Sequence, residues 1–172
     1  KRGAGGGGRG SAKSNRETEI IGDIGEAFFH EWLSARLESD YGADCWVSHA
    51  RARYGFPPAG NDDLGYDFRV SDPTGSLFGK PATTFLIEVK STSTDGAGSF
   101  PMTRHEWEQA RRCHEADGVE VYAIVRIFST NDKPRIGDVI VDPFSGLLNG
   151  LVRLAERDLW VTVAPLVDGI DQ

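Results

Sequence analysis

The chain has 172 residues, 39% of them apolar and 10% aromatic, which is enough for one globular domain with a hydrophobic core. It holds no run of eighteen apolar residues and no signal-peptide pattern, so we expect neither a membrane span nor secretion. Two cysteines, Cys45 and Cys113, are too few for a disulfide framework, and we interpret them as reduced thiols of an intracellular protein. The net charge of −7 argues against a protein that attracts nucleic acid through its overall field.

The first sixteen residues differ in composition from the rest of the chain. They include five basic residues, no acidic residue and almost no apolar surface, so they cannot bury enough area to order themselves. We therefore predict a flexible Gly/Arg-rich linker over residues 1–16, a tether rather than a nucleic-acid-binding arm, and a single domain over residues 17–172. Because the chain begins with Lys1 instead of Met, we expect it to be part of a longer protein or a processed form of one.

Residues 17–38 are predicted to form the first helix, because apolar side chains recur there at helical spacing. The stripe consists of Ile21, Ile24, Phe28, Trp32 and Ala35, widened by Phe29, Leu33 and Leu37. Gly22 and Gly25 each cost roughly 1 kcal/mol in a helix relative to alanine, so we expect them to permit a close backbone approach. Glu26 lies near the edge of the stripe and is either a surface carboxylate or a third acid that reaches a functional site.

The segment after the first helix combines an expected edge strand with a basic loop. Residues 46–48 predict the strand, and the loop that follows carries Arg51 and Arg53 together with a tyrosine. Two arginines and a tyrosine beside an acidic site suit phosphate contacts and base stacking, although a solvated loop is the alternative. Asp62 and Asp63 precede the next strand, and we interpret them as turn acids.

Two strands, over residues 65–70 and 84–90, carry the candidate catalytic residues. Both contain residues that favour strands, and the turn-rich segment between them predicts that they pair antiparallel. Because side chains alternate across a strand, Asp67 lies on one face of the first strand, and Glu88 and Lys90 share one face of the second. The opposite, apolar faces are expected to consist of Tyr66, Phe68 and Val70 on the first strand and Phe85, Ile87 and Val89 on the second.

Three charged side chains on apolar strands require an explanation, because burying an ion costs several kcal/mol unless it is paired or binds a metal. One explanation is a simple salt bridge near the strand end, since Glu-x-Lys is a common tripeptide. The other is a metal site. Two carboxylates, Asp67 and Glu88, suit a hard cation such as Mg²⁺, and Lys90 can orient or activate a bound water.

A second helix is predicted to start at Thr103, which forms a capping box with Glu106, and to end at Gly118. The cap gives Glu106 a local role, which argues against a catalytic one. Arg104 could form a basic patch with the other arginines of this helix, but acidic residues interleave with them, so a solvated helix face is the default interpretation. Three residues of this helix lack the paired ligand spacing of a zinc site and are interpreted as ordinary helix residues: His105, Cys113 and His114.

The remaining segments complete a mixed α/β pattern. Residues 119–128 are almost continuously apolar, which predicts a strand buried on both faces. A short strand over residues 138–141, a short helix over 147–156 and a final strand over 159–163 follow.

The order helix, strand, strand, strand with Glu-x-Lys, helix, strand resembles the restriction-endonuclease-like PD-(D/E)XK superfamily. A more specific resemblance, covering about residues 17–143, is to the C-terminal domain of plant NO VEIN proteins. It rests on Gly22–Trp32 with its Gly25-Glu26 pair, Trp46, Tyr66-Asp67, Ile87-Glu88-Val89-Lys90-Ser91-Thr92, and Thr103 with Glu106-Trp107. It implies an α/β fold with a central mixed sheet flanked by helices (an αβββαβ core). Tyr66 stands where the superfamily motif has a proline.

The resemblance also implies roles for individual residues. Asp67 and Glu88 would hold Mg²⁺ or Mn²⁺ with the backbone carbonyl of Val89, and Glu26 would be an auxiliary ligand. Lys90 would position the attacking water. Apart from the resemblance, contacts to nucleic acid are expected from Arg51, Arg53 and Arg104.

The function that we expect is metal-dependent hydrolysis of phosphodiester bonds in DNA, within an intracellular protein. Related domains are often fused to ATPases or helicases, so we expect such a domain in the same chain or in an associated one. The alternative is a catalytically inactive nuclease-like module that recognises nucleic acid or a partner protein. A third hypothesis is a structural ion-pair cluster in an unrelated fold.

Overall fold

The computed structural model describes residues 15–38, 41–80, 82–95, 98–116, 119–155 and 159–163. The helices are α1 (Asn15–Leu37), α2 (Ala50–Arg53), α3 (Arg104–Glu115) and α4 (Pro143–Leu148), with 3-10 turns η2 (Ala43–Cys45) and η3 (Asp62–Leu64). The strands are β1 (Phe68–Asp72), β2 (Ala82–Ser91), β3 (Phe100–Met102), β4 (Glu120–Phe128), β5 (Arg135–Val141), β6 (Val152–Ala155) and β7 (Leu159–Val163). The linker predicted at the N-terminus lies outside the described residues as far as residue 14, and α1 begins two residues earlier than predicted.

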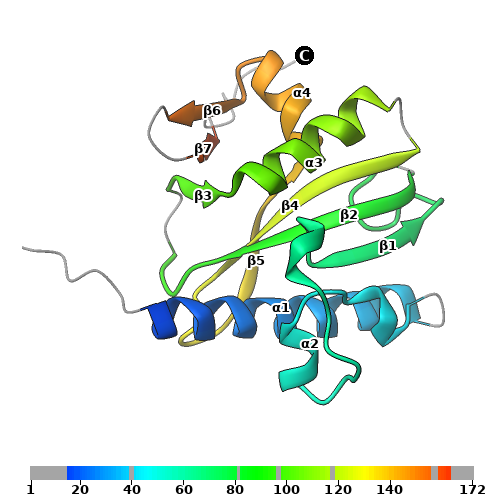
Figure 1. Ribbon diagram of the computed structural model, residues 1–172, viewed down its shortest axis with the longest axis vertical. Helices are drawn as coiled ribbons and strands as arrows, with labels where there is room; N and C mark the ends of the chain where they lie inside the picture. The colour runs from blue at the N-terminus through cyan, green and yellow to red at the C-terminus, as the bar shows by residue number, and fades with distance from the viewer. Residues whose placement is uncertain are drawn as a thin grey trace, which may run out of the picture.

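A four-stranded mixed sheet in the order β1-β2-β4-β5 forms the centre of the fold (Figure 1). The antiparallel pairing of β1 with β2 confirms the prediction from the turn-rich connection. β2 runs parallel to β4, and β5 returns antiparallel to β4. After its first residue β4 is buried throughout, as its continuous apolar sequence predicts.

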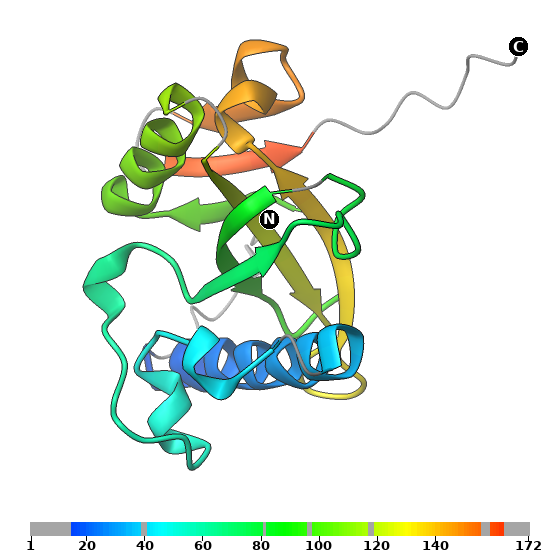
Figure 2. The same cartoon turned by 90° about the vertical axis from the view of Figure 1, so that its right-hand side faces the viewer.

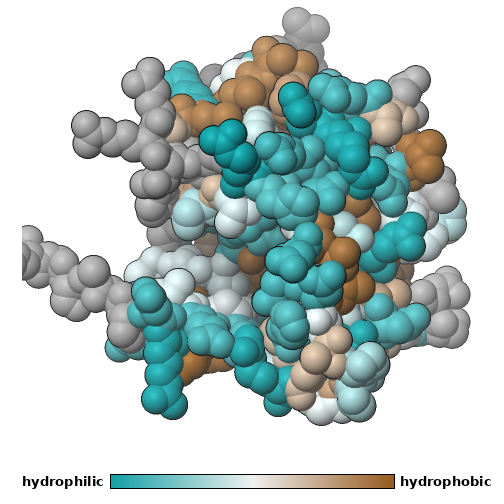
Figure 3. Space-filling model, viewed as in Figure 1, coloured by the Kyte–Doolittle hydropathy of each residue, from teal (hydrophilic) through white to brown (hydrophobic). Residues whose placement is uncertain are grey.

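The two faces of the sheet are covered by different helices, α1 on one side and α3 on the other (Figures 1 and 2). The side chains of β2 alternate between the two cores as predicted. Phe85, Ile87 and Val89 belong to the core that includes Phe29 of α1. Leu86 belongs to the core that includes Ala110 and Cys113 of α3 and Tyr122 of β4. The face seen in Figure 3 is largely hydrophilic, which agrees with the apolar side chains being collected in these two cores.

The close approach of α1 to the sheet depends on Gly25. A Cβ atom at Gly25 would lie 1.7 Å from Ser91 Oγ of β2, whereas a Cβ atom at Gly22 would meet nothing within 4 Å. The expectation of a close approach is therefore correct for Gly25 and wrong for Gly22. The buried residues of α1 are spaced by four, at Ile21, Gly25, Phe29 and Leu33, so the buried stripe is narrower than predicted and leaves Ala35 exposed.

One predicted strand and one predicted helix differ in the structure. Residues 46–48 form no strand, and only an isolated bridge links Trp46 to Phe68. The predicted loop after them contains the short helix α2. The helix predicted over 147–156 ends at Leu148, because Gly150 adopts a left-handed φ of 81° and the chain then enters β6.

A second, three-stranded sheet in the order β3-β7-β6 lies beside α3 and α4 (Figure 2). The sequence did not predict β3 or β6. β3 has three residues, one of them Pro101, and it is held by antiparallel pairing with β7. No helix among the described residues is long and apolar enough to cross a membrane.

Candidate active site

The register of β1 and β2 places Asp67 opposite Glu88. Phe68 pairs with Ile87, and the Asp67 backbone N–H continues the pairing by donating to the Ile87 carbonyl (2.9 Å). The Asp67 side chain is then held from β2, because the Val89 backbone N–H donates to Asp67 Oδ2 (2.8 Å). Asp67 therefore lies just before β1, with one carboxylate oxygen fixed by the neighbouring strand.

Tyr66 does not share a face with Phe68 and Val70, contrary to the prediction. It lies outside β1, after Gly65 in a left-handed conformation with φ of 75°, and it packs against the core on the α3 side. Side chains alternate regularly only within a strand, so after the turn at Gly65 the Tyr66 side chain lies on the α3 side of the sheet.

Glu88 and Lys90 lie on the same face of β2 and contact each other, as predicted. Lys90 Nζ is 2.8 Å from Glu88 Oε1 and donates to Glu106 Oε2 of α3 at 2.7 Å. Glu88 and Glu106 are only 7% and 8% exposed. The lysine thus bridges two buried carboxylates, one on its own strand and one on the first turn of the helix above it.

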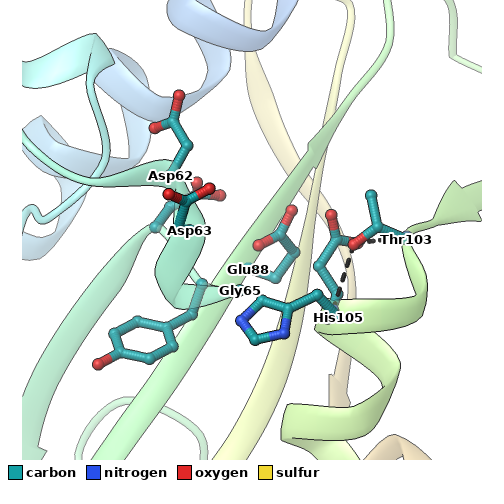
Figure 4. A pocket seen from close by; sticks show the side chains of 9 residues that line it. Asp62, Asp63, Gly65, Glu88, Thr103 and His105 are labelled. Atoms are coloured by element: carbon teal, nitrogen blue, oxygen red, sulfur yellow. Dashed lines mark hydrogen bonds between the residues drawn. The ribbon is translucent and has the colours of Figure 1, made fainter.

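A cavity of about 620 Å³ opens in front of these residues. Its lining consists of Asp62, Asp63, Gly65, Tyr66, Asp67, Glu88, Thr103, His105 and Glu106. Figure 4 shows Glu88 between Asp62 and Asp63 of η3 on one side and Thr103 and His105 at the start of α3 on the other. Asp67 and Glu88 therefore face one solvent-accessible space, in which small ligands and water have room.

The buried carboxylates have strongly perturbed protonation equilibria. Burial raises the pKa of Asp67 well above its ordinary value, and the charges of Glu88 and Glu26 raise it further. Burial also raises the pKa of Glu88 to about 7, although the Lys90 charge opposes this. Burial lowers the pKa of Lys90, but the Glu88 and Glu106 charges outweigh it and the net shift is upward, so the amine stays protonated. Such a cluster suits a bound cation, because several carboxylates share the positive charge of Lys90.

Glu26 is not a surface carboxylate. Its Oε2 accepts hydrogen bonds from the Trp46 indole N–H (2.9 Å) and from the Ser48 hydroxyl. Burial raises its pKa to about 7, against the opposing effect of these two bonds. Its charge contributes to the raised pKa values of Asp67 and Glu88, so it lies within electrostatic reach of the site.

A three-carboxylate metal site is not formed in the described part of the chain. There, no group of three or more His, Cys, Asp or Glu side chains is arranged to hold one metal ion. If a metal binds here, Asp67 and Glu88 would supply two side-chain donors, and further donors would come from backbone carbonyls such as that of Val89 and from water. This donor set fits Mg²⁺, which binds through one or two carboxylates and keeps several waters.

The three arginines expected to contact nucleic acid are not gathered at the cavity. Arg51 Nε donates to the Phe56 carbonyl (3.0 Å). Arg53 forms ion pairs with Glu19 and Asp23. Arg104 is exposed on the first turn of α3, next to His105, which does line the cavity.

Sequence reasoning missed three contributions to the site. Asp62 and Asp63 were interpreted as turn acids, and they do lie in η3, but they also line the cavity. Glu106 forms the predicted capping box, with Thr103 N–H donating to Oε2 (3.1 Å) and Thr103 Oγ1 accepting from Glu106 N–H (3.2 Å). Its additional contact with Lys90 joins residues sixteen positions apart, and no local pattern signals it.

A mixed sheet with α1 and α3 on opposite faces, an Asp just before β1 and Glu-x-Lys on the neighbouring β2 is compatible with the restriction-endonuclease-like PD-(D/E)XK class. The family model "Protein NO VEIN, C-terminal" matches residues 25–139, more than half of the chain, so the chain belongs to that family. Asp67, Glu88, Lys90 and Glu106 all lie within the matched region. No curated protein and no solved structure matches the chain.

Proposed function

We propose that this domain is a Mg²⁺- or Mn²⁺-dependent nuclease that hydrolyses phosphodiester bonds in DNA. The observation that carries the proposal is that Asp67 and Glu88 line one cavity, while Lys90 contacts Glu88 and Glu106, two buried carboxylates of the same lining. Burying these charges costs several kcal/mol per ion in the metal-free protein. A purely structural role would not offset this free-energy cost, whereas a divalent cation bound to the carboxylates would.

Asp67 and Glu88 would hold the metal with the Val89 carbonyl. Asp67 has one oxygen bonded to the Val89 N–H, and Glu88 has one bonded to Lys90, so each carboxylate has a second oxygen to offer. A bound Mg²⁺ stabilises charge on a phosphate oxygen and lowers the pKa of its water. Glu26 would act on this site through its charge, from its place beside Trp46 and Ser48.

Lys90 would position the attacking water and stabilise negative charge that develops on the phosphate. The amine is held protonated between two carboxylates, so it serves as a hydrogen-bond donor and a fixed positive charge. Donors that are fixed before the reaction stabilise a transition state more effectively than flexible ones.

The competing function is a nuclease-like module that binds nucleic acid or a partner protein without cleaving it. The acidic cavity favours this alternative, because Asp62 and Asp63 line it and the described arginines do not. A catalytically inactive module, however, has no use for two buried acids and a lysine on apolar strands. We therefore favour the enzyme.

DNA contacts from Arg51, Arg53 and Arg104 belong to the same proposal. Arg104 is exposed and is the sequence neighbour of His105, which lines the cavity, whereas Arg53 would have to exchange its ion pairs with Glu19 and Asp23 for phosphates. We further propose an intracellular location and an ATPase or helicase domain in the same or an associated chain.

The test combines metal binding with DNA cleavage at low salt. Wild-type protein should bind Mn²⁺ or Mg²⁺ in a calorimetric titration and should cleave single- or double-stranded DNA only when the metal is present. Metal binding without cleavage of either substrate would favour the non-catalytic module. Absence of metal binding would favour a structural ion-pair cluster.

A further inference from the structure

Glu106 is buried more deeply than its role in the helix cap requires. A capping box needs only a carboxylate that accepts from the N-cap N–H, and this can happen at the surface. Glu106 is 8% exposed, and its Oε2 accepts from both Thr103 N–H (3.1 Å) and Lys90 Nζ (2.7 Å). Burying an ion is costly, so the second contact indicates a second role.

The surroundings of Lys90 show what that role is. Its ammonium lies between Glu88 Oε1 at 2.8 Å and Glu106 Oε2 at 2.7 Å. Glu88 is a ligand in the proposed metal site. A cation bound there would attract the Glu88 carboxylate and repel the Lys90 ammonium. Glu106 is anchored in the first turn of α3 by its cap bonds and does not depend on the metal. It is therefore the partner that can keep the long lysine side chain in place.

We propose that Glu106 is a positioning residue, which acts by fixing the Lys90 ammonium beside Glu88, a carboxylate that lines the cavity. This inference rests on the proposed function for its consequence in catalysis, but the contact itself is testable without cleavage. Glu106 acts through Lys90, and loss of its oxygen should release the ammonium towards solvent.

The chain offers well-matched variants for the test. Both contacts of Glu106 use one oxygen, so the amide oxygen of Glu106→Gln can accept both bonds, and glutamine is accepted in capping boxes. Glu106→Ala removes both contacts. Thr103→Ala removes the other half of the cap and leaves the Lys90 contact. Glu108→Ala removes an exposed acid two residues away on the same helix.

The first measurement follows the ammonium directly, by NMR of protein with ¹⁵N-labelled lysine. The chain has five lysines, and loss of one signal in Lys90→Arg assigns Lys90. In metal-free wild type, the Lys90 ammonium protons should exchange slowly with water. Exchange should be at least tenfold faster in Glu106→Ala and close to wild type in Glu106→Gln, Thr103→Ala and Glu108→Ala. Unchanged exchange in Glu106→Ala would overturn the proposal.

The second measurement is the single-turnover rate of DNA cleavage at saturating Mg²⁺. Glu106→Ala should slow it by about 10²- to 10⁴-fold, as expected for loss of a positioned group, while the metal affinity stays within a few-fold of wild type. Glu106→Gln should recover most of the rate, and Glu108→Ala should cleave normally. In the double variant with Lys90→Ala, Glu106→Ala should cause no further loss, because both act through one group. The proposal would be overturned if the two substitutions reduced the cleavage rate independently, or if Glu106→Gln did not recover the rate.

The two measurements separate this inference from the proposed function. If wild type cleaves no DNA, the nuclease proposal fails, and the ammonium exchange still decides whether Glu106 fixes Lys90. If Glu106→Ala fails to fold, Glu106→Asp replaces it, because aspartate keeps the charge and the cap but is one carbon too short to hold the amine. Exchange as slow as wild type in Glu106→Asp would then count against the proposal.

Discussion

At the scale of single residues, the Lys90→Ala substitution should affect metal binding and DNA cleavage in opposite directions. Lys90→Ala removes a positive charge beside the carboxylates, so Mg²⁺ should still bind, and more tightly than to wild type. Cleavage should fall by about 10²- to 10⁴-fold, because the attacking water loses its positioning group. Asp67→Ala and Glu88→Ala should instead weaken metal binding together with cleavage. Calorimetric titration beside the cleavage assay checks both effects, and equal loss of metal affinity in Lys90→Ala would contradict this division of roles.

The sequence predicts the part of the site that follows from strand periodicity. Alternation along two paired strands is a local rule, so the sequence alone identifies Asp67, Glu88 and Lys90 as candidates. In the structure the register of β1 and β2 places Asp67 opposite Glu88, and Glu88 contacts Lys90. The face predicted for the Tyr66 side chain was wrong, because a turn at Gly65 interrupts the alternation. The second contact of Glu106 could not be predicted, because it depends on how α3 packs over β2.

At the scale of the elements, the contact between α1 and β2 depends on one of two neighbouring glycines. Gly25→Ala would place a methyl group against Ser91 Oγ and within 2.8 Å of Ser91 Cβ, so moving the hydroxyl alone does not relieve the clash. We expect a loss of about 1–3 kcal/mol in the free energy of unfolding, typical of overpacking.

Gly22→Ala is the matched control for this prediction. It lies one turn earlier, has open space around its Cβ position, and should be neutral or stabilising by up to about 1 kcal/mol through helix propensity. Urea denaturation of both variants provides the comparison. Equal stability of the two variants would show that the contact of α1 with β2 is looser than the structure indicates.

The longer elements could be predicted from the sequence and the shorter ones could not. β2, β4 and α3 have strong apolar patterns or a capping box, and their predicted positions are confirmed within a few residues. β3 and β6 have three and four residues and exist through pairing with β7, so their own composition carries little signal. The helix predicted in place of β6 reflects this limit, since short apolar runs suit either structure.

At the scale of the whole molecule, protons and metal should compete for the same carboxylates. Burial raises the pKa values of Glu26 and Glu88 from 4.5 to about 7, so the folded chain binds more protons than the unfolded chain between these values. These groups therefore contribute stability below about pH 4.5, and the contribution is lost as the pH rises through about 7. The metal-free protein should become less stable across this range.

Mg²⁺ should restore the stability that is lost on deprotonation. At a hundredfold excess over Kd the gain is about 2.7 kcal/mol, which corresponds to a Tm increase of roughly 5–10 °C for a chain of this size. The increase should be larger at pH 8 than at pH 5.5 and absent in Asp67→Asn. Thermal denaturation with Mg²⁺ or with EDTA at both pH values measures it. An increase of equal size at both pH values would indicate that the metal binds elsewhere.

The central claim, that Asp67 and Glu88 hold a metal for DNA cleavage, is tested most directly by single-turnover cleavage over a range of Mg²⁺ concentrations. Low salt is needed, because a chain of net charge −7 should bind DNA weakly. Wild type and Asp44→Asn, which neutralises an exposed acid, should cleave with Mg²⁺ and stop with EDTA, while Asp67→Asn leaves the DNA intact. Cleavage by Asp67→Asn at the wild-type rate, or intact DNA with wild type at every Mg²⁺ concentration, would contradict the claim.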